Sequence, residues 1–182
     1  AQFWNDILNY MMGSILETAP NDVPIDEIKL SIERLGRFMT GMVAAGSVFG
    51  ILLGLMLGRW WQSQLFNPGG FGQEFIMIKT SPKFAMGTVV IIAVALLAGG
   101  SVSELAWNIS VPLVVLYTFI GTAIIHVMLA ARKNAKIMMP IFYGTMFILS
   151  IMNPFTIMPI AFAGLADTWL NFRAKISNQT NR

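Results

Sequence analysis

The stretch FMTGMVAAGSVFGILLGLMLG, residues 38–58, decides the fold class of this chain. It contains no charged residue, and Arg37 and Arg59 bracket it. An apolar helix of about 20 residues, rising ~1.5 Å per residue, covers the roughly 30 Å hydrocarbon core of a bilayer. We therefore expect a transmembrane helix at 38–58.

The composition of the whole chain agrees with this assignment. Of its 182 residues 55% are hydrophobic and 12% are charged, and there is no cysteine. Soluble domains carry about 25% charged residues. The composition excludes a soluble enzyme, a disordered tail and a disulfide-stapled secreted domain. The net charge of +3 comes from short basic clusters beside apolar runs, which indicates membrane topology and not binding of nucleic acid.

Further apolar runs predict additional spans at 84–100 and 109–131. The uncharged stretch that begins at residue 137 is too long for one span, and Asn153-Pro154 lies at its middle. A proline favours a helix break at this point, which gives spans at 137–152 and 154–170. The alternative is one kinked, re-entrant element. The predicted fold class is thus all-α, a polytopic transmembrane helical bundle with about five spans in a domain at 38–182.

Residues 1–37 are the largely polar part of the chain. Apolar residues from Phe3 to Leu16 recur at helical spacing beside a polar face, which predicts an amphipathic helix. Residues 19–24 have turn composition, and Pro24 suits the first position of a second helix. We expect an extramembrane amphipathic helical hairpin at 1–37. The chain starts without Met or a signal-peptide pattern, so we expect it to be the carboxyl-terminal portion of a longer protein.

The charges of the connections predict the orientation. Residues 59–83, 132–136 and the tail after residue 170 are basic, whereas 1–37 is acidic and 101–108 contains only Glu104. The positive-inside rule then places the amino-terminal hairpin outside and the carboxyl terminus in the cytoplasm of a bacterial inner membrane.

Four glycines recur at a constant spacing of four residues within the first span, a set that we call the glycine row: Gly46, Gly50, Gly54 and Gly58. On a helix they form one smooth stripe that permits close backbone packing. The sequence favours packing within this chain. A homo-oligomer face and a docking face for another membrane protein are the alternatives.

The segment RWWQSQLFNPGGFGQEF, residues 59–75, combines tryptophans, a basic residue and a glycine turn at a predicted cytoplasmic interface. The tryptophans suit an aromatic belt, and Gly69-Gly70 permits positive φ in a tight turn. The alternative is anion binding by the turn amides, although no P-loop or dinucleotide pattern is present. The loop residues of interest are Arg59, Trp60, Trp61, Asn67, Pro68, Gly69, Gly70, Phe71, Gly72, Glu74 and Phe75.

This segment, followed by Ile78-Lys79, resembles the signature of the YybS-like family of uncharacterised bacterial membrane proteins, and GLADTWLNFR at 164–173 resembles its ending. The resemblance covers about 35–176, and family members are longer, with further helices at their amino termini. The family is distantly similar to S components of energy-coupling-factor vitamin transporters, which implies a small-molecule uptake subunit by fold-level analogy. The alternative is a non-transporting membrane scaffold or assembly factor that binds another protein.

Two charges flank the last turn of the final span, Asp167 and Arg173. Six residues apart, they do not share a helix face, so we expect Asp167 to pair with Arg59 at the interface. The alternative is that both side chains snorkel. His126 is expected to hydrogen-bond to a neighbouring helix, in preference to a metal or proton-relay role.

No nucleophilic triad, carboxylate pair or metal-ligand cluster is evident in the sequence, so we expect no enzymatic activity, no cofactor and no metal. The expected partners are the lipid bilayer and either another membrane protein or a second copy, through the glycine row. A small-molecule ligand would be bound by polar residues within the spans: Thr40, Ser47, Thr88, Tyr117, Thr118, Thr122, His126, Tyr143, Thr145 and Ser150.

Overall fold

The computed structural model describes residues 2–17 and 24–173, and every regular element among them is helical. The elements are α1 (Gln2–Glu17), α2 (Ile25–Phe66), α3 (Gly70–Ile76), α4 (Pro82–Leu97), α5 (Gly100–Ala130), α6 (Ala135–Met152), the 3₁₀ turn η1 (Pro154–Ile157) and α7 (Met158–Leu170). Three of them, α2, α5 and α6, are long and apolar enough to cross a membrane. The described part of the chain is therefore all-helical, and its long apolar helices are those of a membrane protein.

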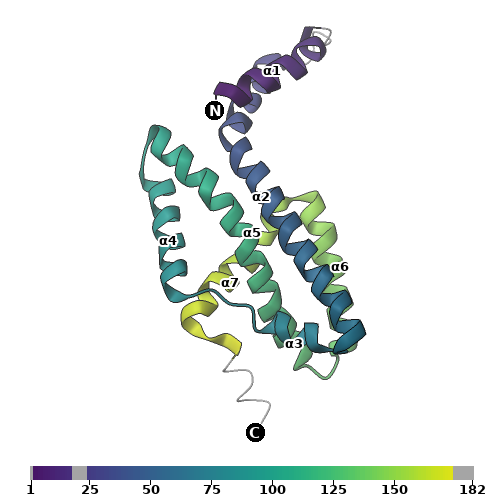
Figure 1. Ribbon diagram of the computed structural model, residues 1–182. Coiled ribbons are helices and arrows are strands. Elements are labelled where there is room, and N and C mark those ends of the chain that lie inside the picture. Colours follow the sequence, from purple (N-terminus) through teal and green to yellow (C-terminus); the bar gives the residue numbers. More distant parts are fainter. Residues whose placement is uncertain (1, 18–23, 174–182) are drawn as a thin grey trace.

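Helix α5 is the centre of the bundle, with α2, α4 and α7 packed around it (Figure 1). Its buried residues Tyr117, Ile120 and Ile124 form the core together with Ala161 of α7. The axes of α5 and α7 come so close that a Cβ atom on Gly164 would collide with the backbone of α5. Helix α6 lies at the edge and buries no residue.

Helix α2 runs without interruption from the polar region into the apolar stretch, whereas the sequence predicted two separate helices. No proline or turn sequence stands between Gly36 and Phe38, so the helix continues. It changes direction near the upper end of the bundle in Figure 1.

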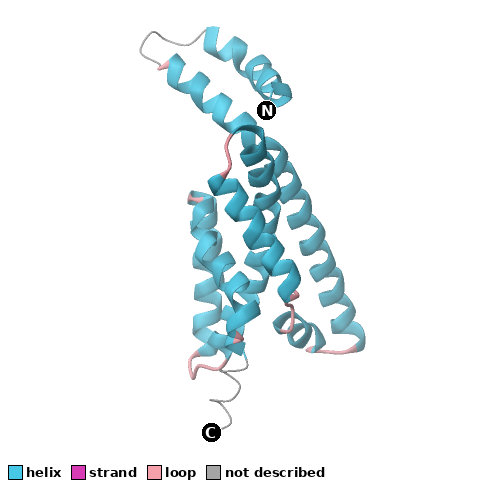
Figure 2. Ribbon diagram, turned by 90° about the vertical axis from the view of Figure 1, so that its left-hand side faces the viewer, coloured by secondary structure: helices cyan, strands magenta, loops and turns pink. Residues whose placement is uncertain are grey.

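Helix α1 packs along the first part of α2, and Figure 2 shows the two at the end of the molecule opposite the carboxyl terminus. Trp4 Nε1 donates a hydrogen bond to Thr40 Oγ1 at 2.8 Å. Gly36 of α2 is buried against Asn5, where a side chain would collide. The turn expected at 19–24 lies, except for Pro24, outside the described residues.

The break at Asn153-Pro154 is confirmed. Helix α6 ends at Met152, the 3₁₀ turn starts at Pro154, and Asn153 Oδ1 accepts a hydrogen bond from the Phe155 amide at 3.0 Å. The connection expected at 101–108 is wrong, because these residues form the first two turns of α5. Three of its polar residues, Ser103, Glu104 and Asn108, have partners on adjacent helices: Ser103 Oγ, for example, donates to the Ala95 carbonyl at 2.7 Å.

Candidate functional site

The segment 59–75 lies at the end of the bundle opposite α1, and it is more helical than the sequence indicated. Helix α2 continues through the tryptophans to Phe66. It ends before Asn67-Pro68, because a proline disfavours helical geometry in the residue that precedes it. The loop itself is therefore only 67–69, and α3 begins at Gly70.

Arg59 and Glu74 join the end of α2 to α3. The guanidinium binds the carboxylate through two nitrogens: Nε donates to Oε2 at 2.6 Å and Nη2 donates to Oε1. The third nitrogen, Nη1, donates to Gln62 Oε1 at 2.6 Å. Hydrogen bonding to Arg59 holds the pKa of the Glu74 carboxyl below its usual range. This bidentate pair fixes the direction in which α3 leaves α2.

The glycine turn uses positive φ at one of its two glycines. Gly69 has φ 86°, in the left-handed region that a side chain disfavours. Gly70 does not have positive φ; it is the first residue of α3 and lies against the side chain of Asn67. The turn thus depends on Gly69 for its backbone conformation and on Gly70 for space.

Aromatic side chains of the segment divide between the interior and the surface. Phe75 is buried and meets the His126 ring edge-on, with 6.0 Å between ring centroids. Trp60 and Trp61 are 42% and 66% exposed, as residues of an interfacial belt would be. His126 Nδ1 lies 2.8 Å from Tyr143 Oη of α6, which confirms the expected contact with a neighbouring helix.

The predicted ion pair between Arg59 and Asp167 is wrong. Asp167 is buried and pairs with Arg173, with 3.2 Å between Oδ2 and Nε. The prediction assumed that the helix continues from Asp167 as far as Arg173. Helix α7 ends at Leu170, and Asn171 takes the left-handed conformation at φ 49°, which turns the chain back toward Asp167.

Arg173 also holds the linker between α3 and α4. Its Nη2 donates to the Ile78 carbonyl at 2.7 Å, and its Nη1 donates to the Ile76 carbonyl. Thr168 Oγ1 lies 3.3 Å from Thr80 Oγ1. Burial lowers the pKa of the Arg173 guanidinium, and the Asp167 carboxylate opposes that shift. The segments 59–75 and 164–173 therefore meet at this linker.

The glycine row faces away from the rest of the described chain. An ideal Cβ atom built on Gly46, Gly50, Gly54 or Gly58 finds no atom within 4 Å, and all four glycines are exposed. The sequence favoured packing of the glycine row within this chain. In the described residues the row contacts no other helix, so that prediction is wrong. Periodicity locates a stripe on one helix, but it does not determine toward which neighbour the stripe points.

The face of α2 that does pack contains Gly41 and Ala45, both buried. Successive helical residues are rotated by about 100°, which puts the centre of the glycine row on the opposite side of α2. Gly41 touches the backbone of Asn108 of α5. The Asn108 amide binds both the N–H of Gly41 and the carbonyl of Arg37, groups that pair with each other in a regular α-helix.

Sequence reasoning missed Asn108, although a signal was present. Pro112 lacks an N–H, so the Asn108 carbonyl has no partner four residues further along α5. An asparagine four residues before a proline therefore marks a point where the backbone hydrogen bonding of an apolar helix is interrupted. Gly121 and Gly164, at the crossing of α5 and α7, were also missed because no other glycine lies within several turns of either along its helix.

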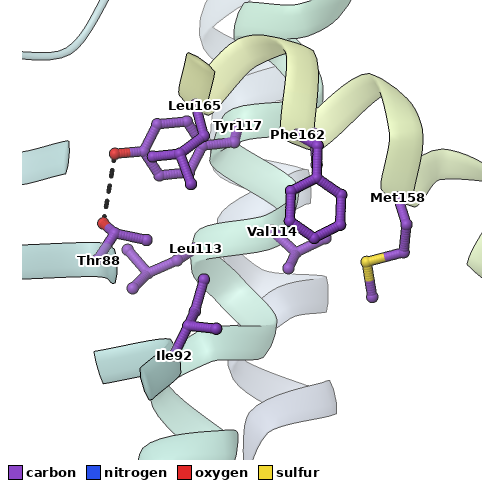
Figure 3. A pocket seen from close by; sticks show the side chains of 9 residues that line it. Thr88, Ile92, Leu113, Val114, Tyr117, Met158, Phe162 and Leu165 are labelled. Atoms are coloured by element: carbon purple, nitrogen blue, oxygen red, sulfur yellow. Dashed lines mark hydrogen bonds between the residues drawn. The ribbon is translucent and has the colours of Figure 1, made fainter. Parts of the chain in front are cut away.

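A small cavity lies between α4, α5 and α7 (Figure 3). Its volume is about 40 Å³, and apolar side chains dominate its walls. The one polar pair that faces it is Thr88 and Tyr117, whose hydroxyl oxygens lie 3.3 Å apart. Pockets that bind small molecules usually enclose about 300–1,000 Å³. The cavity therefore has room for roughly one water molecule.

Among residues 2–17 and 24–173, no three His, Asp or Glu side chains come together as metal ligands would. Comparisons of the chain with protein-family models, with curated proteins and with solved structures found no match. The resemblance to the YybS-like family stays a prediction from the sequence.

Proposed function

We propose that this chain is a non-catalytic, integral membrane subunit that assembles with another membrane protein, and that the glycine row of α2 is the contact surface. One observation carries the proposal: the four glycines are exposed, with no atom within 4 Å of their ideal Cβ positions. Lipid provides no hydrophobic drive for helices to associate, so close backbone contact on small-residue faces is how such helices bind one another.

The shape of this surface fits a second helix. Gly46 and Gly58 are separated by three helical turns, or ~18 Å at 1.5 Å per residue. Ser47 is exposed beside the row and adds a further small side chain. A helix that crosses here would contact the backbone of α2 along more than half of the hydrocarbon core. A scaffold or assembly factor of the membrane is the function that such a surface supports.

The proposal includes the orientation. We place the chain in a bacterial inner membrane, with α1 and the first part of α2 outside and the carboxyl terminus in the cytoplasm. Helices α2, α4, α5, α6 and α7 alternate in direction (Figures 1 and 2), which supports five crossings. The last turns of α2, the start of α4 and the α5–α6 turn lie at the end of the bundle near the carboxyl terminus (Figure 1). These segments contain Arg59, Lys83 and Arg132, in agreement with the positive-inside rule. Helix α4 has 16 residues and would cross a locally thinned bilayer.

Orientation is measured with single cysteines at Asn9 of α1 and Asn134 of the α5–α6 turn, both exposed. An impermeant thiol reagent added to intact cells should label the cysteine at position 9 and leave the one at position 134 unlabelled. Permeabilised cells should show labelling at both. The reverse pattern in intact cells would exclude this orientation.

Docking is tested with a photo-crosslinking amino acid at Ser47 and, as the matched control, at Leu55. Both positions are exposed, but Leu55 lies about a third of a turn from the centre of the glycine row. The Ser47 probe should give one adduct with a different protein in native membranes, and the Leu55 probe should not. An adduct made of two copies of this chain would mean that the glycine row mediates self-association and not docking of a different protein. Equal adducts or none at both positions would contradict it.

The resemblance supports a second candidate function, an S-component-like subunit for small-molecule uptake. The observation in its favour is the Thr88–Tyr117 hydroxyl pair at the cavity between α4, α5 and α7. A ligand larger than water would require α4 to move away from α5. Native mass spectrometry of the purified chain would reveal a retained small molecule, and Tyr117→Phe should weaken its retention. A ligand-free spectrum for protein taken directly from membranes would argue against uptake.

A further inference from the structure

The turn between α5 and α6 contains a second concave surface, which we call the α5–α6 groove. It is open to the outside and encloses about 680 Å³. Arg132, Lys133 and Asn134 line it together with apolar residues from the last turns of α5 and the first turn of α6. Its volume lies within the range of about 300–1,000 Å³ that is usual for small-molecule sites.

The groove has a charged rim and an apolar floor. Arg132 and Lys133 are exposed, and neither forms an ion pair with a carboxylate in the described part of the chain. Met128, Leu129 and Met138 form the floor. A site of this composition suits a ligand with an anionic head and a hydrocarbon body.

The position of the groove indicates where such a ligand comes from. The groove opens where the apolar lengths of α5 and α6 end, at the boundary between hydrocarbon and headgroups in the proposed orientation. Helix α6 buries none of its residues, so acyl chains can lie along it directly from the floor. Asn134 makes no side-chain cap bond to α6, which leaves its amide free to donate to a phosphate oxygen.

We propose that the α5–α6 groove binds the phosphate headgroup of an anionic phospholipid, with Arg132 and Lys133 as its cationic partners. The phosphate lies between these two side chains, and the glycerol and upper acyl carbons cover Met128 and Met138. Basic pockets between transmembrane helices are a recurrent type of lipid site. This site is separate from the glycine row on α2 and does not depend on what docks there.

The experiment uses native mass spectrometry of the whole purified chain in detergent. Dioleoyl phosphatidylglycerol and dioleoyl phosphatidylcholine are titrated in parallel, because they have the same acyl chains and differ in net headgroup charge. The chain should retain one molecule of phosphatidylglycerol at concentrations where phosphatidylcholine is lost. Equal retention of the two lipids would overturn the proposal, and this comparison needs no variant.

A double variant tests the assigned residues. Arg132→Gln with Lys133→Gln should weaken phosphatidylglycerol binding about 30-fold, since each basic residue near a membrane surface contributes about a fivefold factor. Lys79→Gln with Lys83→Gln is the matched control, because it removes the same charge from residues outside the groove. Lys79 belongs to the α3–α4 linker and Lys83 to the first turn of α4, and these segments lie at the same end of the bundle as the α5–α6 turn (Figure 1). This control variant should bind as the wild type does. If both double variants lost phosphatidylglycerol binding equally, the general surface charge would explain the binding, and the proposed site would be wrong.

Free phosphate is the other source of the same chemistry. Glycerol 3-phosphate and inorganic phosphate are added to the lipid-bound chain at the concentration of the lipid. These anions lack acyl chains and so gain no contact with the apolar floor. The phosphatidylglycerol adduct should therefore persist. Displacement of the lipid by either anion at equal concentration would mean that the groove binds a soluble phosphate, and the lipid assignment would be wrong.

Discussion

The side chain of Asn108 bridges two backbone groups of α2, the N–H of Gly41 and the carbonyl of Arg37, which pair with each other in a regular α-helix. Its Oδ1 accepts from the Gly41 N–H at 2.6 Å, and its Nδ2 donates to the Arg37 carbonyl at 2.7 Å. Insertion of a side chain between these groups is an established cause of helix bending. The bend separates the part of α2 that packs on α1 from the part that carries the glycine row (Figure 1).

Replacement of Asn108 by leucine should destabilise the chain. The variant leaves the Gly41 N–H and the Arg37 carbonyl without their partner, and each unsatisfied polar group costs about 1–3 kcal/mol when it is buried. Thermal unfolding followed by circular dichroism in detergent measures the loss. Ile109→Leu, at the neighbouring exposed position, serves as the control and should melt with the wild type. A wild-type melting curve for Asn108→Leu would mean that α2 regains its regular hydrogen bonds without this side chain.

The crossing of α5 and α7 should not tolerate even one methyl group. A Cβ atom on Gly164 would collide with the carbonyl of Tyr117 and the amide of Gly121, both of them backbone groups that cannot move aside. We expect Gly164→Ala to lower the unfolding free energy by about 1–3 kcal/mol. Gly144→Ala is the matched control, because no atom lies within 4 Å of its ideal Cβ position and alanine favours a helix. Similar stabilities of the two variants would show that α5 and α7 do not cross at Gly164.

The Arg59–Glu74 pair predicts a pH dependence with a definite sign. Hydrogen bonding to Arg59 lowers the pKa of Glu74 in the folded chain. The stabilisation is therefore present above the usual glutamate pKa of about 4.3 and is lost as the pH falls through the lower folded value. The difference in melting temperature between wild type and Glu74→Gln should be clear near pH ~7, and it should shrink as the pH falls below about 4.3 and through the lower folded value. If the difference in melting temperature stayed constant as the pH fell, the charge of Glu74 would not be the source of the stabilisation.

The apolar lengths made the membrane helices predictable, because bilayer thickness and the rise per residue fix how long an uncharged run must be. Asn153-Pro154 also predicted its break, since the proline effect is local. The end of α2 was placed too early, at Gly58. Loss of hydrophobicity after Arg59 marks the edge of the lipid and not the end of the helix, which continues to Phe66.

Contacts between helices were harder to predict, because they depend on the rotation of each helix about its axis. The glycine row was correctly located on one face, yet that face points away from the bundle. Arg59 and Asp167 lie at the same end of the molecule, but each found a nearer partner. For Asp167 the deciding feature is the left-handed Asn171, a single backbone angle that the sequence does not reveal.

Docking of another membrane protein on the glycine row is tested most directly by Gly54→Leu, with Leu55→Ile as the control. Nothing lies within 4 Å of the ideal Cβ of Gly54, so the isolated chain should fold and melt as the wild type does. A bulky side chain in a close helix contact costs about 1–3 kcal/mol, which weakens assembly by a factor of about 5 to 150.

The measurement is the size of the complex extracted from native membranes, by native gel electrophoresis, together with the melting curve of the purified chain. Gly54→Leu should release the chain from its complex while its melting temperature stays unchanged, and Leu55→Ile should leave both unchanged. A Gly54→Leu variant that remains in a complex of wild-type size would mean that the glycine row faces lipid, which would contradict the proposed function.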